Sequence, residues 1–257
     1  MRTFQATTAP SRSWRSLGPV LMALALLCLG DAAQAQDAVG TVTHLGGLST
    51  ARRDDGSTRL LAPRSVVHEG EILVTEPGTY LEVRFLDDAM LTLGPDSRVQ
   101  VTRYSWNPDN PAADRVELEL QRGTLRSETG RLGKRNHDAI RIKVPGGEIT
   151  VHGTTFVAQS VPGTSAAPSP PTPSLPTQPA PGLYVQVIDG MINVANGGGS
   201  TNFTAGQFGF VATATQPPVI LPANPGMQFT PPPAFSATSG TSGTAGGKPG
   251  DVDCQVR

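Results

Sequence analysis

The residue types that most often bind metals are few in this chain and poorly spaced. No two histidines stand two or four residues apart, the spacings at which one strand or one helix face would present both imidazoles to a single metal ion. The four histidines are His44, His68, His137 and His152, and the two cysteines are Cys28 and Cys254. The sequence therefore predicts no metal site and no bound cofactor.

Serine and aspartate form no recognisable catalytic arrangement. Serine is common, but no Gly-x-Ser-x-Gly nucleophile elbow occurs. Asp87 and Asp88 are adjacent, and neighbouring strand residues point to opposite faces, so these two carboxylates fit a turn better than an acid–base pair. We predict no catalytic residues and a protein that is not an enzyme. A polysaccharide-active enzyme is the alternative, and it requires acidic residues gathered in a groove.

One cluster of charge points to a binding function. Seven basic residues lie within residues 122–143, and the section 127–138 has the composition of a polar loop between strands. The candidate residues for an anionic partner are Arg126, Arg131, Lys134 and Arg135. Such a partner would be a cell-wall polymer, a lipid headgroup or an acidic protein, and the alternative is a solvated basic loop. No aromatic residues are interleaved with these charges, so nucleic acid is not expected.

The elements that must position these residues are strands. Val116, Leu118 and Leu120 alternate with acidic residues, which buries one face of the segment and exposes the other, and residues 140–144 repeat the pattern. Similar short runs are separated by turn sequences such as Asp-Gly and Pro-Gly. We predict an all-β fold of short antiparallel strands arranged as a roll or β-solenoid. Residues 85–93 and 187–194 resemble each other in sequence. They are either two stacked rungs of a solenoid or two unrelated hairpins.

The N-terminus has the pattern of an export signal. Arg2, Arg12 and Arg15 precede an apolar run, residues 17–29, which is too short to span a bilayer and ends before a small-x-small cleavage pattern. We predict that residues 1–35 are a cleaved signal peptide, and an uncleaved anchor is the alternative. Removing three arginines and one aspartate leaves 17 basic and 20 acidic residues, a net charge of −3. A general polyanion-binding field is therefore not expected.

Two segments differ from the strand pattern. Residues 162–181 contain eight prolines and are predicted to form a Pro-rich loop insertion. Residues 216–257 are rich in Pro and then in Gly, Ser and Thr, and we predict a disordered low-complexity tail. The predicted folded body is thus 38–215. After cleavage the mature chain would contain no membrane-spanning run, and its only cysteine would be Cys254, which excludes an intramolecular disulfide.

Taken in order, the strand and turn landmarks resemble those of the FecR domain. The matching segments are residues 40–42, 70–75, 80–88, 91–97, 118–126, 149–157, 185–194 and 205–207. The residues that carry the family pattern are Gly70, Asp87, Gly153, Thr154, Phe156, Asp189, Gly190 and Gly206. The Gly153-Thr154 step is the most specific of them, and we interpret it as a structural feature of the fold rather than a reactive site.

The resemblance implies a bacterial periplasmic β domain. In founding members of the family, this domain relays the state of an outer-membrane transporter to a cytoplasmic sigma factor during iron uptake. Here only 16 residues precede the apolar run, too few for the family's sigma-regulating N-terminal part. We therefore expect a free-standing FecR-like domain, periplasmic or secreted, that acts as a binding or scaffold module for an envelope protein or a cell-wall polymer. The alternative is an envelope signalling component related to the FecR-type regulators.

Overall fold

The computed structural model describes residues 37–163, 179–232 and 235. The predicted signal peptide, most of the Pro-rich insertion and the chain from residue 236 onward lie outside the described residues. The elements are β1 (Ala38–Gly46), β2 (Ser49–Arg52), β3 (Thr58–Leu60), β4 (Val66–His68), β5 (Ile72–Thr75), β6 (Tyr80–Phe85), β7 (Met90–Leu93), β8 (Arg98–Ser105), η1 (Pro111–Ala113), β9 (Arg115–Glu128), α2 (Arg131–Arg135), β10 (Ile140–Val144), β11 (Gly147–Val161), β12 (Gly182–Asn196), β13 (Gly199–Thr204), β14 (Phe208–Val211) and β15 (Val219–Leu221).

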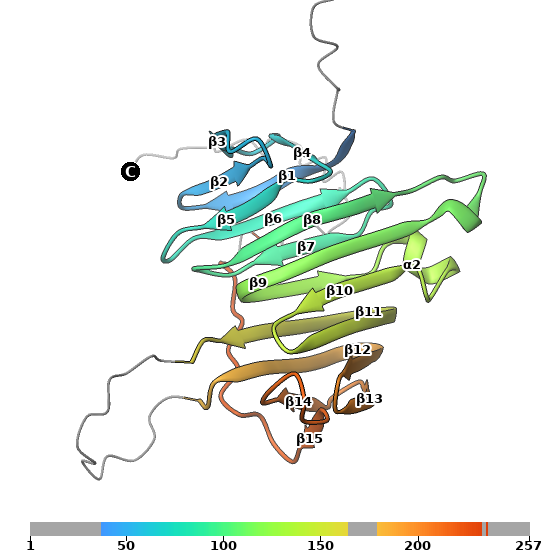
Figure 1. Cartoon of the computed structure of the whole chain (residues 1–257). Helices are drawn as coiled ribbons and strands as arrows, with labels where there is room; N and C mark the ends of the chain where they lie inside the picture. The colour runs from blue at the N-terminus through green and yellow to red at the C-terminus, as the bar shows by residue number, and fades with distance from the viewer. Residues whose placement is uncertain (1–36, 164–178, 233–234, 236–257) are drawn as a thin grey trace, which may run out of the picture. The chain divides into compact units, whose positions relative to one another are not determined.

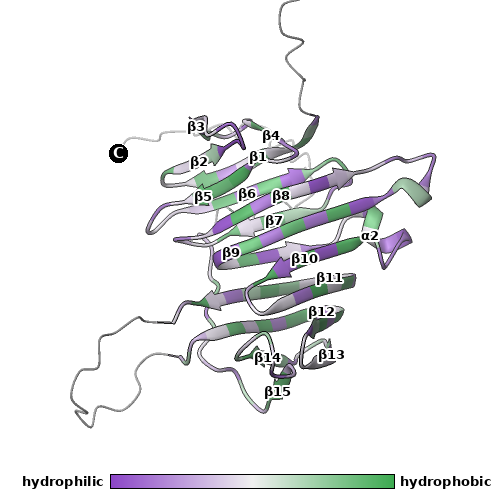
Figure 2. Cartoon of the chain, in the orientation of Figure 1, coloured by the Kyte–Doolittle hydropathy of each residue, from purple (hydrophilic) through white to green (hydrophobic). Residues whose placement is uncertain are grey.

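The alternation seen in the sequence becomes alternate burial in the strands. In β10, Ile140, Ile142 and Val144 are buried, whereas Arg141 and Lys143 are exposed. Figure 2 shows the same banding of apolar and polar residues along the long strand β9. The prediction of an all-β fold is confirmed, with α2 and η1 as short helical turns among the described residues.

One continuous sheet is folded into two layers by three long strands. The first half of β9 pairs with β8 and β10, and its second half pairs with β7 and β11. β11 and β12 also change partners midway. The first layer runs in the order β3-β2-β5-β8-β9-β10-β11-β12-β13, and the second runs β4-β1-β6-β7-β9-β11-β12-β14-β15 (Figure 1). This arrangement agrees with the predicted roll or solenoid-like fold.

The strands differ from the expected short antiparallel set in two ways. β9, β11 and β12 have 14, 15 and 15 residues, because each continues through a bend from one layer into the other. In addition, β10 runs parallel to the first half of β9. The chain leaves the far end of β9, turns through α2 and returns to begin β10 beside the first half of β9. A solenoid-like winding produces parallel neighbours for this reason.

The main hydrophobic core lies between the two layers. Its largest fully buried side chains include Leu81, Leu125, Ile149, Phe156 and Phe203, which come from strands of both layers. A second, smaller cluster is centred on Val157, the neighbour of Phe156 that points the other way. The second layer therefore has apolar residues on both of its faces.

The folded region extends beyond Thr215, where the sequence analysis placed its end. β15 pairs with β14 through residues 219–221, and the described chain continues to residue 232. The apolar triplet Val219-Ile220-Leu221 extends the second layer by one strand, although prolines flank it. At the Pro-rich insertion, β11 ends at Val161 and β12 begins at Gly182, and the insertion itself stays a prediction because most of it lies outside the described residues.

Candidate functional site around Trp106

Six of the eight residues of the family pattern stand where the chain turns between strands or between layers. Gly70 lies between β4 and β5, and Asp87 lies between β6 and β7. Gly153 and Asp189-Gly190 lie at the mutual bend of β11 and β12, where the pairing register shifts. Gly206 lies between β13 and β14. Thr154 and Phe156 are buried beside the β11 bend, Phe156 in the core. The structural role of these residues stays a prediction.

Thr154 ties the bend of β11 to its neighbours on both sides. Its hydroxyl donates to the Met191 carbonyl at 2.5 Å and accepts from the Met191 N–H at 3.2 Å. Its own N–H donates to the Thr129 hydroxyl at 2.9 Å, and that hydroxyl donates back to the Thr154 carbonyl at 2.8 Å. The exchange satisfies main-chain groups that lose their sheet partners where the strands bend.

Glycine is required at this bend for two different reasons. Gly153 has φ +64°, in the left-handed region that other residues enter only with strain. Gly190 has φ +80°, and a Cβ there would also overlap the Gly153 carbonyl oxygen and press on Thr154. The Gly153-Thr154 step of β11 and the Asp189-Gly190 step of β12 therefore face each other where the two main chains approach closely.

Asp87 and Asp88 have different environments although they are neighbours. Asp88 is exposed in the β6–β7 turn with φ +65°, as the turn interpretation predicts. Asp87 is fully buried. Its carboxylate accepts from the Tyr104 hydroxyl at 2.5 Å, from the Ala89 N–H at 3.1 Å and from the Leu132 N–H at 3.1 Å. Asp87 thus joins the β6–β7 turn, β8 and the first turn of α2, which a turn-forming role does not describe.

The ring of Tyr104 continues this network into the core. It stacks on Phe85 with a centroid distance of 4.3 Å and an interplanar angle of 10°. Burial of the phenol, and then the charge and hydrogen bond of Asp87, raise the pKa of Tyr104 well above its usual value. Tyr104 therefore stays protonated at neutral pH and acts as a fixed donor to Asp87.

The predicted anionic-partner residues lie on two elements, β9 and α2. Arg126 lies on the second half of β9 and pairs with Glu128 at 2.9 Å. Arg131 and Arg135 lie on α2, where they pair with Asp88 at 3.0 Å and with Asp114 at 2.8 Å.

Lys134, also on α2, has no salt bridge within the described residues. Three of the four charges are thus partly neutralised inside the chain. An anionic partner for this group stays a prediction.

Trp106 is the aromatic residue beside these charges, and the sequence analysis gave it no role. The Arg135 guanidinium carbon lies 4.0 Å from the Trp106 ring centroid, and that of Arg131 lies 5.6 Å away. Arg135 also donates to the carbonyl of Pro108 at 2.8 Å and to that of Asn107. Cation–π stacking and these hydrogen bonds hold the indole against α2.

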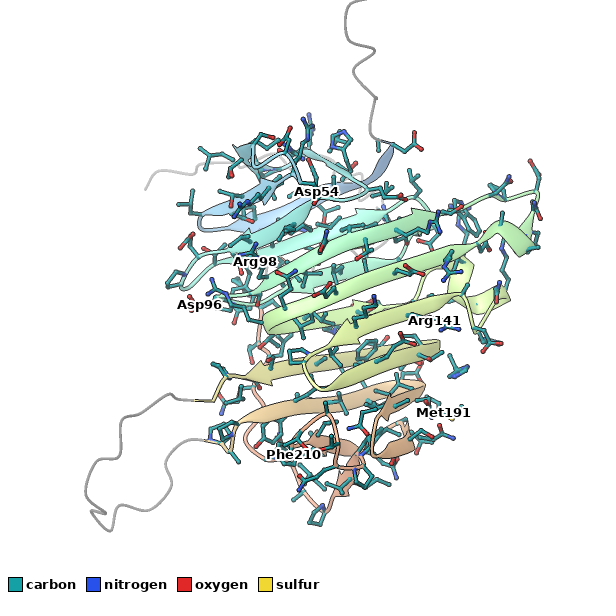
Figure 3. All side chains as sticks on the ribbon, in the orientation of Figure 1. Asp54, Asp96, Arg98, Arg141, Met191 and Phe210 are labelled. Carbon is teal, nitrogen blue, oxygen red and sulfur yellow. The ribbon has the colours of Figure 1, made fainter. Side chains whose placement is uncertain are left out.

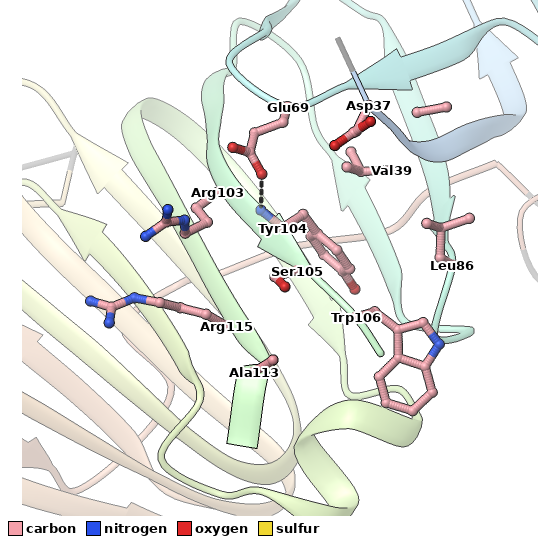
Figure 4. A pocket seen from close by; sticks show the side chains of 11 residues that line it. Asp37, Val39, Glu69, Leu86, Arg103, Tyr104, Ser105, Trp106, Ala113 and Arg115 are labelled. Carbon is pink, nitrogen blue, oxygen red and sulfur yellow. Dashed lines mark hydrogen bonds between the residues drawn. The ribbon is translucent and has the colours of Figure 1, made fainter. Parts of the chain in front are cut away.

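A hollow of about 700 Å³ opens next to Trp106, where β8 ends and β9 begins. We call it the Trp106 hollow and define it by Asp37, Glu69, Leu86, Arg103, Trp106 and Arg115. In Figure 4 Trp106 and Leu86 lie on one side, and the guanidinium groups of Arg103 and Arg115 lie on the other. Leu86 is 53% exposed, which is high for a large apolar side chain.

Acidic groups balance the arginines of the hollow. Glu69 accepts the Tyr104 N–H at 2.9 Å, and Asp37 lies nearby on the same rim (Figure 4). Outside the hollow, Arg115 donates to Glu117 at 2.6 Å; this hydrogen bond, with the charges of Arg115 and Arg103, lowers the pKa of Glu117. The hollow therefore combines both signs of charge with an aromatic and an aliphatic side chain, and of these residue types Trp and Arg are enriched at protein interfaces.

Within residues 37–163, 179–232 and 235, His, Cys, Asp and Glu form no group of three or more that could hold a metal ion. Across the same ranges no helix is long and apolar enough to cross a bilayer.

Comparison with known proteins gives one family and a few distant structures. Residues 71–169 match the family model described as FecR protein, and no curated protein matches the chain. Two crystal structures of a protein from Parabacteroides distasonis ATCC 8503, described as "a putative anti-sigma factor", share 11% identity over 58% of each chain, with a TM-score of 0.41. A structure described as "Cell surface anchoring domain" shares 28% identity over 25% of this chain and 84% of its own, with a TM-score of 0.24.

The family match includes four of the six residues that define the Trp106 hollow, whereas Asp37 and Glu69 precede it. It extends from β5 to the end of β11 and includes Asp87, Trp106 and the Gly153-Thr154 bend. Gly70, Asp189, Gly190 and Gly206 belong to the expected pattern but lie outside the matched residues. The all-β architecture of residues 71–169 agrees with this match, and we conclude that this segment of the chain is similar to the FecR protein family.

Proposed function

We propose that this chain is an exported, non-catalytic FecR-like domain that binds another protein of the bacterial cell envelope through the Trp106 hollow. In this role it serves as a binding or scaffold module, periplasmic or secreted. The observation that carries the proposal is the composition of the hollow, which joins exposed Leu86 and half-buried Trp106 to two arginines and two acids. Trp and Arg are enriched among the residues that dominate protein–protein affinity.

The geometry favours a protein over a cell-wall polymer as the partner. Arg131 and Arg135 are engaged by Asp88 and Asp114, which leaves Lys134 as the basic side chain that α2 offers to a polyanion. In contrast, Leu86 is an apolar anchor point with charged groups around it, as at the centre and rim of a protein interface. The experiment must therefore distinguish a protein partner from a cell-wall polymer.

Site-specific photo-crosslinking in living cells tests the proposal. A benzophenone amino acid replaces Leu86 in the hollow, and in a matched control it replaces Leu60, which is 68% exposed on β3. We expect a discrete crosslinked protein band from position 86 only, lost when Arg103 and Arg115 are changed to glutamate. Equal crosslinking at both positions, or none at position 86, contradicts the proposal. A smear removed by a muralytic enzyme identifies a cell-wall polymer instead.

The FecR match favours a second candidate function, in which the chain is an envelope signalling component related to FecR-type regulators of iron-transport sigma factors. This function requires that the N-terminal segment stays attached to the domain. N-terminal sequencing of the exported protein separates the two candidates: a mature chain that begins at Gln36 removes the signalling route, whereas an intact N-terminus supports it.

A further inference from the structure

The outer face of the second layer carries an apolar surface, which we call the groove, and the end of the described chain covers it. The groove residues include Val157, Tyr184, Phe208 and Phe210, from β11, β12 and β14. Tyr184 and Phe210 pack with a centroid distance of 4.7 Å, and Phe210 is labelled on β14 in Figure 3. We call residues 222–232 with Phe235, which follow β15, the strap.

The strap crosses the outer face of the second layer from β14 to β1, and its apolar side chains pack on the strands that it crosses. Met227 is 7% exposed against Val157 and Tyr184. Phe229 lies edge-on to Tyr80 of β6 with a centroid distance of 6.0 Å. Phe235 lies 6.2 Å from the same Tyr80 ring.

Small residues under the strap make room for its rings. A Cβ on Gly94 would lie 3.4 Å from the Phe229 ring, and one on Gly46 would lie 3.8 Å from the Phe235 ring. Phe235 also meets the His44 ring at a centroid distance of 5.4 Å. The groove thus accepts aromatic side chains at separate points along one segment, which turns at residues 224–227 where the Asn224 side chain accepts from the Gly226 and Met227 N–H groups.

Side chains rather than the main chain attach the strap. Past Leu221, the one main-chain hydrogen bond among the described residues runs from the Phe235 N–H to the Pro232 carbonyl, inside the strap itself. Pro222, Pro225, Pro231 and Pro232 lack the N–H that a sheet ladder needs. An extended Pro-containing segment with apolar anchors on an aromatic groove is a recurrent mode of peptide recognition.

We propose that this groove is a peptide-binding site, for extended Pro-containing segments of another polypeptide that carry a Met-x-Phe anchor like Met227-Gln228-Phe229. The strap is then its intramolecular competitor. A tethered segment of this length reaches an effective concentration on the order of millimolar, so a partner peptide binds only when it outcompetes the strap or when the strap is released. The site is separate from the Trp106 hollow and does not depend on the function proposed for it.

The test uses the full chain and a fluorescein-labelled synthetic peptide with the sequence of residues 217–235. A release variant carries Met227→Asp and Phe229→Ser, which remove the two anchors. We expect this variant to bind the peptide at least about tenfold more tightly than the unmodified chain, by fluorescence anisotropy, because the competitor is lost. A peptide with the same two substitutions should not bind.

A second variant locates the binding at the groove. Phe210→Ser, added to the release variant, should abolish peptide binding, whereas Arg103→Glu, in the Trp106 hollow, should not change it. Circular dichroism and a thermal melt confirm that each variant is folded. Equal affinity of the release variant and the unmodified chain overturns the proposal. A release variant that fails to fold also overturns it, because the strap would then be an integral part of the core.

Discussion

Replacing Asp87 by asparagine tests whether this buried carboxylate organises the site. The side chain keeps its shape but loses its charge and one acceptor oxygen. In the native protein, one oxygen accepts from the Tyr104 hydroxyl and the Ala89 N–H, and the other accepts from the Leu132 N–H. In the variant, the retained oxygen can serve the first pair, and the new NH₂ group then faces the Leu132 N–H, donor against donor.

The expected loss of stability follows from these three contacts. Hydrogen bonds to a buried charged group each contribute about 1.5–3 kcal/mol, and a buried N–H without a partner costs about 1–3 kcal/mol. Losing one bond and weakening two others should lower the free energy of unfolding by about 3 kcal/mol. For a domain of this size that corresponds to a decrease in Tm of about 6–12 °C.

The adjacent Asp88 provides the control, since it is exposed and its ion pairs with Arg84 and Arg131 lie at the surface. Asp88→Asn should cost at most about 1 kcal/mol. Trp106 is the only tryptophan after residue 35, so urea unfolding followed by its fluorescence reports on this site. The reasoning is refuted if Asp87→Asn and Asp88→Asn destabilise the protein equally, or if the first shifts the free energy by less than about 0.5 kcal/mol.

Three further predictions concern the bend and two buried ionisable groups. Gly190→Ala should destabilise by about 3 kcal/mol in urea unfolding, against about 1 kcal/mol for Gly206→Ala, because both have positive φ but only the first lacks space for a Cβ. Burial opposes ionisation of Glu71, but Arg59 and His68 outweigh it and lower its pKa. Stability should therefore fall as the pH drops below about 4.3, less so in Glu71→Gln. Burial and Asp87 raise the pKa of Tyr104, so its contribution to the free energy of unfolding should be lost as the pH rises above about 10. The variant Tyr104→Phe should lose less stability over this alkaline range.

The prediction for Glu71 depends on a cluster that sequence reasoning did not find. The carboxylate is fully buried and accepts from the Arg59 side chain at 2.7 Å and from the His68 N–H at 3.1 Å. Arg53 approaches it at 3.4 Å. These residues are separated by as many as 18 positions, with no spacing that would suggest contact. Only the pairing of β2 with β3 and β5 brings them together.

The sequence by itself determined the strand pattern and the places where the chain turns. Alternation with period two marks the buried face of a strand wherever the strand lies, because successive side chains point to opposite faces. Glycine likewise marks a bend such as Gly153 locally, since the left-handed backbone conformation is a property of one residue. Both signals are read within a few residues, so the all-β fold and the family pattern could be predicted without a structure.

The tertiary structure decided which of these residues act together. Asp87 and Asp88 have the same chemistry, and only the packing of Tyr104 and α2 against one of them makes it buried. The Trp106 hollow combines residues from Asp37 to Arg115. The strap packs on strands that lie far from it in the sequence, since Phe235 meets His44 of β1 about 190 residues before it. Contacts between distant segments depend on how the bent strands β9, β11 and β12 stack the two layers, and no local pattern encodes that stacking.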